Sequence, residues 1–335
     1  MSVPLAGAPG AGGRIGLAAR VVLALALVAA FVVALRGLDA TRTLHALAAV
    51  HTPWIGAAAL CYGAILPLWA GQWHLLAPAS TSQTFRAMLR VVVTTSGVLN
   101  TTPLLVGEAT GVVLLVTVTG LERTAALSVL AMDQLLVGVA KLVVLATAAL
   151  IAPLPDWMAR AAIGLIVLVA ALAALLLLGA ARGVWRAGAP RGSHVAGSLA
   201  ERAARVLDAL PSALAPLRSV RRGGGALVLA LVKKGVEVAA MVCMQRAFGL
   251  DLPVGAAILA LGMLNLSTLL PVVPGNVGVY EGAVVLAYSR YGVAAEQALG
   301  LAAAQHLCYL LALAAPGVLW AGAARWSRAA DVGRR

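Results

Sequence analysis

Long apolar runs constrain the fold of this chain more than any other feature. They approach the roughly 20 residues that a helix needs to cross a bilayer, and they occur at about 17–36, 54–77, 124–151, 157–180, 225–248 and 297–323. The chain of 335 residues is 62% hydrophobic and only 11% charged, which differs sharply from the composition of soluble domains. The sequence therefore predicts an integral membrane protein, built as a single membrane domain over residues 1–335.

Two further apolar regions, 86–121 and 254–291, are interrupted near their middle by proline, glycine and polar residues. In lipid, backbone that is not helical is tolerated only where protein or a water-filled cavity satisfies its polar groups. We therefore expect two re-entrant or broken-helix hairpins beside about six full transmembrane helices, in an all-α polytopic fold. Transporters commonly place their binding sites at such breaks.

The positions of the basic residues indicate the topology. The net charge is +13, and Arg and Lys gather between and beside the apolar runs, which fits cytoplasmic loops and anionic lipid rather than nucleic acid. The longest polar stretch, 182–222, is rich in arginine. We expect this basic loop in the cytoplasm, between a first half (1–181) and a second half (223–324). The N-terminus and the basic C-terminal tail (325–335) are expected on the same side.

Similar segments in the two halves predict an inverted repeat. They are "PLLVGEATGVVLL" at 103–115 and "PGNVGVYEGAVVL" at 274–286. Each contains a glutamate, Glu108 in the first half and Glu281 in the second. A polar residue follows 25 residues later in each case, Asp133 in the first half and His306 in the second. Pairs of interrupted segments in corresponding positions are typical of transporters built from inverted repeats.

The second interrupted segment has the composition of a sharp turn followed by a helix. The prolines at positions 271 and 274 block a continuous helix, and the glycines at 275 and 278 permit a tight turn. We expect a helix to restart near Val279, which places Glu281 in its first turn, where exposed N–H groups favour a carboxylate. Glu108 has the same local pattern. Each glutamate is either a helix-start residue or part of a site that faces a cavity, since ionisable groups at depth are costly.

Other polar residues lie within the apolar segments. Lys233 and Glu237 have the i, i+4 spacing of a local ion pair, but basic groups near the midplane would also suit a phosphate-bearing head group. Lys141 is expected to extend to a membrane interface. The candidate site for a lipid head group or a proton comprises Glu108, Glu281, Asn100, Asp133, His306, Lys233 and Lys234. The helix-break motif comprises Pro103, Gly107, Pro274, Gly275, Asn276 and Gly278.

The sequence does not indicate an enzyme. It has no G-x-S-x-G elbow, H-E-x-x-H pair or P-loop, and a lone histidine such as His306 in an apolar helix is more often a packed, hydrogen-bonded residue. The three cysteines have no paired spacing of a zinc site or disulfide framework. We therefore expect no catalytic residue, no metal and no cofactor.

The interrupted segments resemble two motifs of a flippase-like family, typified by the transmembrane region of lysylphosphatidylglycerol synthase. "LPVVPGNVGVYEGAVVLAYSRYGV" is similar to the family signature P-x-x-P-G-G-x-G-x-x-E, and "TTSGVLNTTPLLVGEATGVVLL" is similar to its first-half motif. The resemblance covers nearly the whole chain. By matching positions it implies roles for Asn100, Pro103, Gly107 and Glu108 and for Pro274, Gly275, Gly278 and Glu281.

The chain departs from the family pattern at three positions. Asn276 stands where a second glycine is usual, Tyr280 where an arginine often precedes the glutamate, and Gly111 where an arginine often follows the first Gly-Glu. Without those arginines, a less charged lipid such as a hopanoid fits better than a strongly anionic head group. After Arg325 only a short basic tail remains, so we expect no soluble aminoacyl-transfer domain.

The resemblance implies a multi-pass inner-membrane protein. The Arg-over-Lys and Ala-rich composition fits a bacterium, and the basic residues predict that both termini are cytoplasmic. Its expected partner is a membrane lipid, of polyprenyl or hopanoid type for example, which it would bind and move between leaflets. The two breaks would then line a shared cavity near the midplane. The alternative is an accessory subunit or scaffold that holds a lipid or a lipid-modifying enzyme and transports nothing. The amphipathic stretch "LAERAARVLDALPSALAPL" in the basic loop suits such docking.

Overall fold

The computed structural model describes residues 50–78, 83–102, 106–152, 220–267 and 274–320, together with isolated positions between 41 and 48 and between 156 and 167. Throughout these residues the regular structure is helical, which confirms the predicted all-α class. The predicted span at 17–36, the tail at 325–335 and nearly all of the span at 157–180 and of the basic loop lie outside the described residues.

The described part of each half contains a long helix, two short helices and another long helix. In the first half these are α3 (Thr52–Leu76), α4 (Phe85–Thr101), α5 (Val106–Thr119) and α6 (Arg123–Ile151). In the second half they are α9 (Val220–Ala247), α10 (Val254–Ser267), α11 (Val279–Ser289) and α12 (Ala295–Leu313), with a short 3-10 turn, η3 (Pro274–Asn276), before α11. The two interrupted regions are therefore pairs of short helices, as the sequence predicted.

The long helices agree with the predicted spans. Three described helices are long and apolar enough to cross a membrane, namely Thr52–Leu76, Arg123–Ile151 and Ala295–Trp320, the last of which extends α12. Helix α9 has a comparable 28 residues, but it carries Lys233, Lys234 and Glu237 near its middle. The predicted total of six full spans stays a prediction, because two of the six runs lie largely or wholly outside the described residues.

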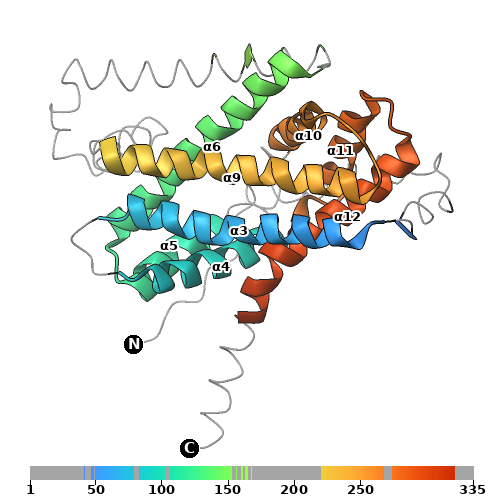
Figure 1. Cartoon of the computed structure of the whole chain (residues 1–335). Helices are drawn as coiled ribbons and strands as arrows, with labels where there is room; N and C mark the ends of the chain where they lie inside the picture. Colours follow the sequence, from blue (N-terminus) through green and yellow to red (C-terminus); the bar gives the residue numbers. More distant parts are fainter. Residues whose placement is uncertain are drawn as a thin grey trace, which may run out of the picture.

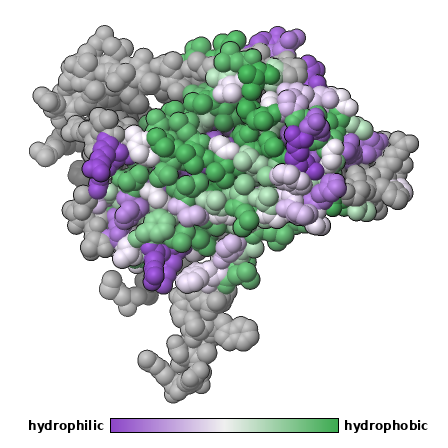
Figure 2. Space-filling view, in the orientation of Figure 1, coloured by the Kyte–Doolittle hydropathy of each residue, from purple (hydrophilic) through white to green (hydrophobic). Residues whose placement is uncertain are grey.

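Helices α3 and α9, one from each half, lie side by side (Figure 1). Helix α6 packs on α9 and α10, and α12 packs on α3 and α4, so the two halves interlock. Large side chains such as Tyr62, Trp73 and Tyr288 are fully buried between the helices. The outer face is apolar over a broad area (Figure 2), and leucines such as Leu150 are highly exposed there, as expected of a surface that contacts lipid.

Polar side chains at the end of α4 bond to backbone carbonyls of the preceding turn. The Asn100 amide donates to the Ser96 carbonyl at 2.9 Å, and the Thr101 and Thr102 hydroxyls donate to the carbonyls of Gly97 and Val98. Each of these carbonyls is also the i−4 acceptor of a backbone N–H, as in the bond from the Thr102 N–H to the Val98 carbonyl at 2.9 Å. The side-chain bonds are therefore additional, and they satisfy the polar side chains on their own helix. Residues 103–105, including Pro103, lie outside the described part, and α5 begins at Val106.

The second break is a turn with several left-handed residues. Gly275, Asn276 and Gly278 have φ of 64°, 54° and 85°, and α11 begins at Val279, as predicted. Glycine adopts this conformation without strain, and asparagine tolerates it better than most residues do. Asn276 therefore keeps the backbone geometry at a position where the family usually has glycine.

Glycines also allow two close helix contacts. A Cβ atom built on Gly107 would lie 2.6 Å from the Leu99 Cα, so α5 folds directly back on α4 only because position 107 has no side chain. A Cβ on Gly317 would lie 2.2 Å from the Val93 carbonyl oxygen, where α12 crosses α4. The first contact holds the two short helices of the first break together, and the second holds α4 against the C-terminal extension of α12.

We predict that Gly107→Ala destabilises the protein by about 1–3 kcal/mol, because the new methyl group overlaps the α4 backbone. Gly138→Ala is the matched control, since Gly138 also lies within a helix but has open space around it. That control should be neutral or stabilising by up to about 1 kcal/mol. The measurement is denaturant unfolding of the purified protein in detergent. Equal stabilities for the two variants would contradict the close packing of α4 and α5.

Candidate functional site

The two breaks meet inside the bundle. The turn η3 of the second half packs against α4 of the first half, and a Cβ atom on Gly275 would lie 3.5 Å from the Asn100 carbonyl oxygen. Residues that are 175 positions apart in the chain therefore lie in contact. The sequence analysis proposed that the two breaks line a shared cavity. Asn100 of the first break and Asn276 of the second both line the cavity described next.

The cavity has two adjoining compartments, of about 160 and about 280 Å³. Six residues line both of them: Asn100, Lys141, Lys234, Glu237, Asn276 and Tyr309. His306 and Tyr280 line the smaller compartment, whereas Glu108, Asp133 and Lys233 line the larger one. The walls thus combine an apolar bundle with several ionisable side chains, which is the composition of a ligand site rather than of a packed core.

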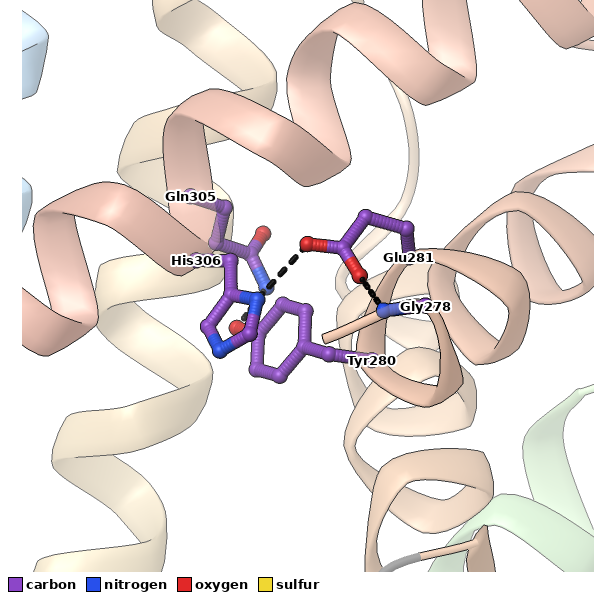
Figure 3. Close-up of polar contacts among 5 residues, drawn as sticks. All are labelled: Gly278, Tyr280, Glu281, Gln305 and His306. Atoms are coloured by element: carbon purple, nitrogen blue, oxygen red, sulfur yellow. Dashed lines mark hydrogen bonds and ion pairs between the residues drawn. The ribbon is translucent and has the colours of Figure 1, made fainter. Parts of the chain in front are cut away.

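Glu281 is held by two hydrogen bonds in the first turn of α11 (Figure 3). Its Oε2 atom accepts the backbone N–H of Gly278 at 2.6 Å, and its Oε1 atom lies 2.6 Å from Nδ1 of His306 on α12. Both side chains are buried. The first bond satisfies a backbone donor at the break, so the helix-start role that the sequence allowed for Glu281 is present in the structure.

Tyr280 and Gln305 fix the histidine from the other side. The Tyr280 ring stacks on the His306 ring, with centroids 4.1 Å apart and planes 9° apart. Gln305 Nε2 donates to the Tyr280 hydroxyl at 2.7 Å. The tyrosine that replaces the usual arginine therefore supports the Glu281–His306 pair instead of contributing a positive charge.

Asp133 belongs to a second cluster, on α6. Gln72 Nε2 of α3 donates to its Oδ1 atom at 3.0 Å, and Lys233 Nζ of α9 lies 3.9 Å from the same atom. Lys234 instead pairs with Glu237, at 2.7 Å. Of the two alternatives for Lys233, the local ion pair with Glu237 is therefore not the one observed. Lys233 faces α6, and the neighbouring lysine takes the glutamate three residues later.

Glu108 differs from Glu281 in its surroundings. It lines the larger compartment, and its Oε2 atom is buried without a hydrogen-bond partner among the described residues. The amide nitrogen of Asn265, on the wall of the smaller compartment, is likewise buried and unpartnered there. Buried polar atoms are nearly always satisfied in native proteins. An unpartnered acceptor and an unpartnered donor on cavity walls are therefore places where a ligand can bond.

The structure brings the candidate site residues to one cavity or to its immediate wall. Glu108, Asn100, Asp133, Lys233 and Lys234 line the larger compartment, and Glu281 adjoins the smaller one through His306. Gly275 and Asn276 line the smaller compartment, whereas Gly107 and Gly278 shape the breaks. The side chain of Pro274 is outside the described part. No three His, Cys, Asp or Glu residues within that part are placed to hold a metal ion.

Three residues of the site were not expected from the sequence. Gln72 was overlooked, although a glutamine in an otherwise apolar span is a detectable signal. Tyr280 was noted only for the arginine it replaces. Lys141, expected at a membrane interface, lines both compartments, because α6 packs against α5, α9 and α10. The expectation that Lys141 extends to a membrane interface stays a prediction.

One protein-family model matches the chain. It is described as the lysylphosphatidylglycerol synthase TM region, and it matches residues 18–317. The match includes both breaks, the cavity and all the candidate site residues. A comparison with curated proteins finds no match.

We predict that Lys233→Met destabilises the protein by about 3 kcal/mol, because it leaves the buried Asp133 carboxylate without its cationic partner. The double variant Lys233→Met, Asp133→Asn should recover most of this loss, since no unpaired charge then remains. Denaturant unfolding in detergent measures both. A double variant no more stable than the single one would show that the ion pair does not hold α6 to α9.

Proposed function

Because the chain belongs to the lysylphosphatidylglycerol synthase transmembrane-region family, we propose that this membrane protein binds a lipid by its polar head group and moves it between leaflets. The head group would enter the cavity where the two breaks meet, and the acyl or terpenoid tail would stay in the surrounding bilayer. The observation that carries the proposal is the unpartnered Glu108 oxygen on the wall of a charged cavity within an otherwise apolar bundle.

The order of the helices supports the transport step. Each half contains long, short, short and long helices, and we infer that the halves are inverted repeats with oppositely directed breaks. In transporters of this kind, one repeat rocks against the other around a fixed site at the repeat interface. The contact between η3 and α4 joins the two halves, and it would lie at this interface. We keep the orientation given by the basic residues, with both termini on the cytoplasmic side of a bacterial inner membrane.

The charges on the cavity walls bear on the class of lipid. Three lysines, Lys141, Lys233 and Lys234, are balanced by three carboxylates, Glu108, Asp133 and Glu237. A strongly anionic head group would need an excess of positive charge, which the described walls do not carry. We therefore propose a head group with little net charge, able to accept and to donate hydrogen bonds. The hydroxyl groups of a hopanoid-type lipid and a zwitterionic phospholipid head group both satisfy this description.

We predict that Glu108→Gln lowers lipid retention at least tenfold, about 1.4 kcal/mol in binding. The variant keeps the side-chain shape but loses the charged acceptor that faces the cavity. Native mass spectrometry of the gently purified protein compares the lipids retained by the wild type and by the variant. Glu122→Gln is the matched control, because it makes the same chemical change at an exposed position before α6 and should leave retention unchanged.

The same variants are then tested in vesicles for movement of a fluorescent phospholipid between leaflets. Specific retention together with movement in the wild type, both reduced by Glu108→Gln, is the result expected of a lipid translocator. Specific retention without any movement would instead favour the accessory-subunit or scaffold function. If the wild type retains only bulk phospholipid in membrane proportion and moves none, the proposed function is wrong.

A further inference from the structure

We propose that Glu281 and His306 form a proton-binding site separate from the head-group site, and that a proton moves with the lipid. This inference rests on the proposed function and adds its energy source. The sequence treats Glu108 and Glu281 as equivalent members of two similar motifs. Their surroundings differ, and the difference assigns them different ligands.

The geometry of the pair leaves one atom available for a proton. The Nδ1 atom of His306 lies 2.6 Å from Glu281 Oε1, so a neutral imidazole with its hydrogen on Nδ1 donates to the carboxylate. The Nε2 atom points away from Glu281 (Figure 3), and the histidine lines the smaller compartment. A proton that arrives through the cavity can add to the Nε2 lone pair, and the same N–H bond breaks when it leaves.

Adding that proton removes a buried net charge. With a neutral imidazole the pair carries one negative charge, and with an imidazolium it carries none. A net charge at membrane depth is unfavourable, so the pair retains its proton while the cavity is closed to water. Exchange becomes feasible when one side of the cavity reaches solvent. This is the behaviour required of a proton carried by alternating access.

Ionisable groups on neighbouring helices face the same compartment and set its electrostatics. They are Tyr62 of α3, Lys141 of α6, Lys234 and Glu237 of α9, Tyr280 of α11 and Tyr309 of α12. Lys234 and Glu237 compensate each other through their ion pair, and the tyrosines are neutral at ordinary pH. Among these lining cations, Lys141 alone has no carboxylate partner at ion-pair distance in the described part. Its positive charge opposes protonation of His306 when the two side chains approach each other, because like charges repel.

The pair is also joined to the break itself. The Glu281 carboxylate that bonds His306 accepts the N–H of Gly278 through its other oxygen. When His306 takes up a proton, its hydrogen bond to the Glu281 carboxylate becomes a bond between two ionised groups and is stronger. The charge state of the pair therefore changes how firmly Glu281, which also bonds the turn, is held. Proton binding and the conformation of the second break are therefore linked through one side chain. Glu108, whose Oε2 atom has no partner among the described residues, is then the carboxylate that bonds the lipid head group.

The test uses the full-length protein in vesicles of phosphatidylethanolamine and phosphatidylglycerol with a trace of fluorescent phospholipid. If one proton moves per lipid, a gradient of one pH unit should drive the labelled lipid to a leaflet ratio of up to about tenfold. His306→Gln should abolish this ratio, because its amide still donates to Glu281 but cannot take up a proton. His74→Gln, a histidine outside the pair near the end of α3, should retain it.

A second readout needs no variant. A pH-sensitive dye trapped inside wild-type vesicles should report a proton flux that accompanies movement of the labelled lipid. If the labelled lipid moves at the same rate and to the same leaflet ratio with and without the pH gradient, and no proton flux accompanies it, the proton site is wrong but the proposed function stands. A tenfold ratio that persists in His306→Gln, with native mass spectrometry confirming the variant's lipid retention, would overturn the assignment to His306. A wild type that moves no labelled lipid and that retains only bulk phospholipid in membrane proportion would overturn both proposals.

Discussion

Backbone N–H and C=O groups have no water to bond inside a bilayer, and this constraint explains how the centre of the protein is built. Wherever a helix is interrupted at depth, other groups must take the place of the missing helical bonds. At the second break Glu281 accepts the N–H of Gly278, which has no helical partner at the start of α11. At the end of α4 the polar side chains of Asn100 and Thr101 satisfy their own donor groups on carbonyls of the preceding turn. Polar side chains are therefore present at the breaks for structural reasons, and the cavity forms where two such breaks meet.

Much of this fold follows from local sequence signals. Apolar runs of sufficient length predicted the long helices, and proline and glycine predicted both breaks, including the restart of a helix at Val279. The predicted meeting of the breaks also agrees with the structure, through the contact between Gly275 and Asn100. These features depend on residues that are close together in the chain, or on a repeated pattern that is visible in both halves.

Partners on different helices could not be predicted in the same way. Which residue faces Asp133 depends on how α3, α6 and α9 are rotated about their axes, and apolar side chains surround these helices on nearly all sides. With no polar face to fix the rotation, the sequence could not distinguish a Lys233–Glu237 pair from the observed Lys233–Asp133 and Lys234–Glu237 pairs. The position of Lys141 has the same cause.

The two glutamates show why a shared motif does not fix a shared environment. Each is followed 25 residues later by a polar residue, but only Glu281 bonds to that residue, His306. In the first half Asp133 is already bonded by Gln72 and lies near Lys233. Because these contacts come from other helices, the difference between Glu108 and Glu281 arises only when the whole bundle has assembled.

The Asp133–Lys233 pair also has a consequence for biogenesis. A charged residue near the centre of an inserting helix costs about 2.5–3.5 kcal/mol, so α9 enters the bilayer more easily if partners are already there. Asp133 precedes Lys233 by 100 residues, which corresponds to about 5–20 s of synthesis at ordinary elongation rates. During that interval Gln72, made earlier still, is the available partner for Asp133. Each polar group is therefore synthesised after the residue that can bond to it, Asp133 after Gln72 and Lys233 after Asp133.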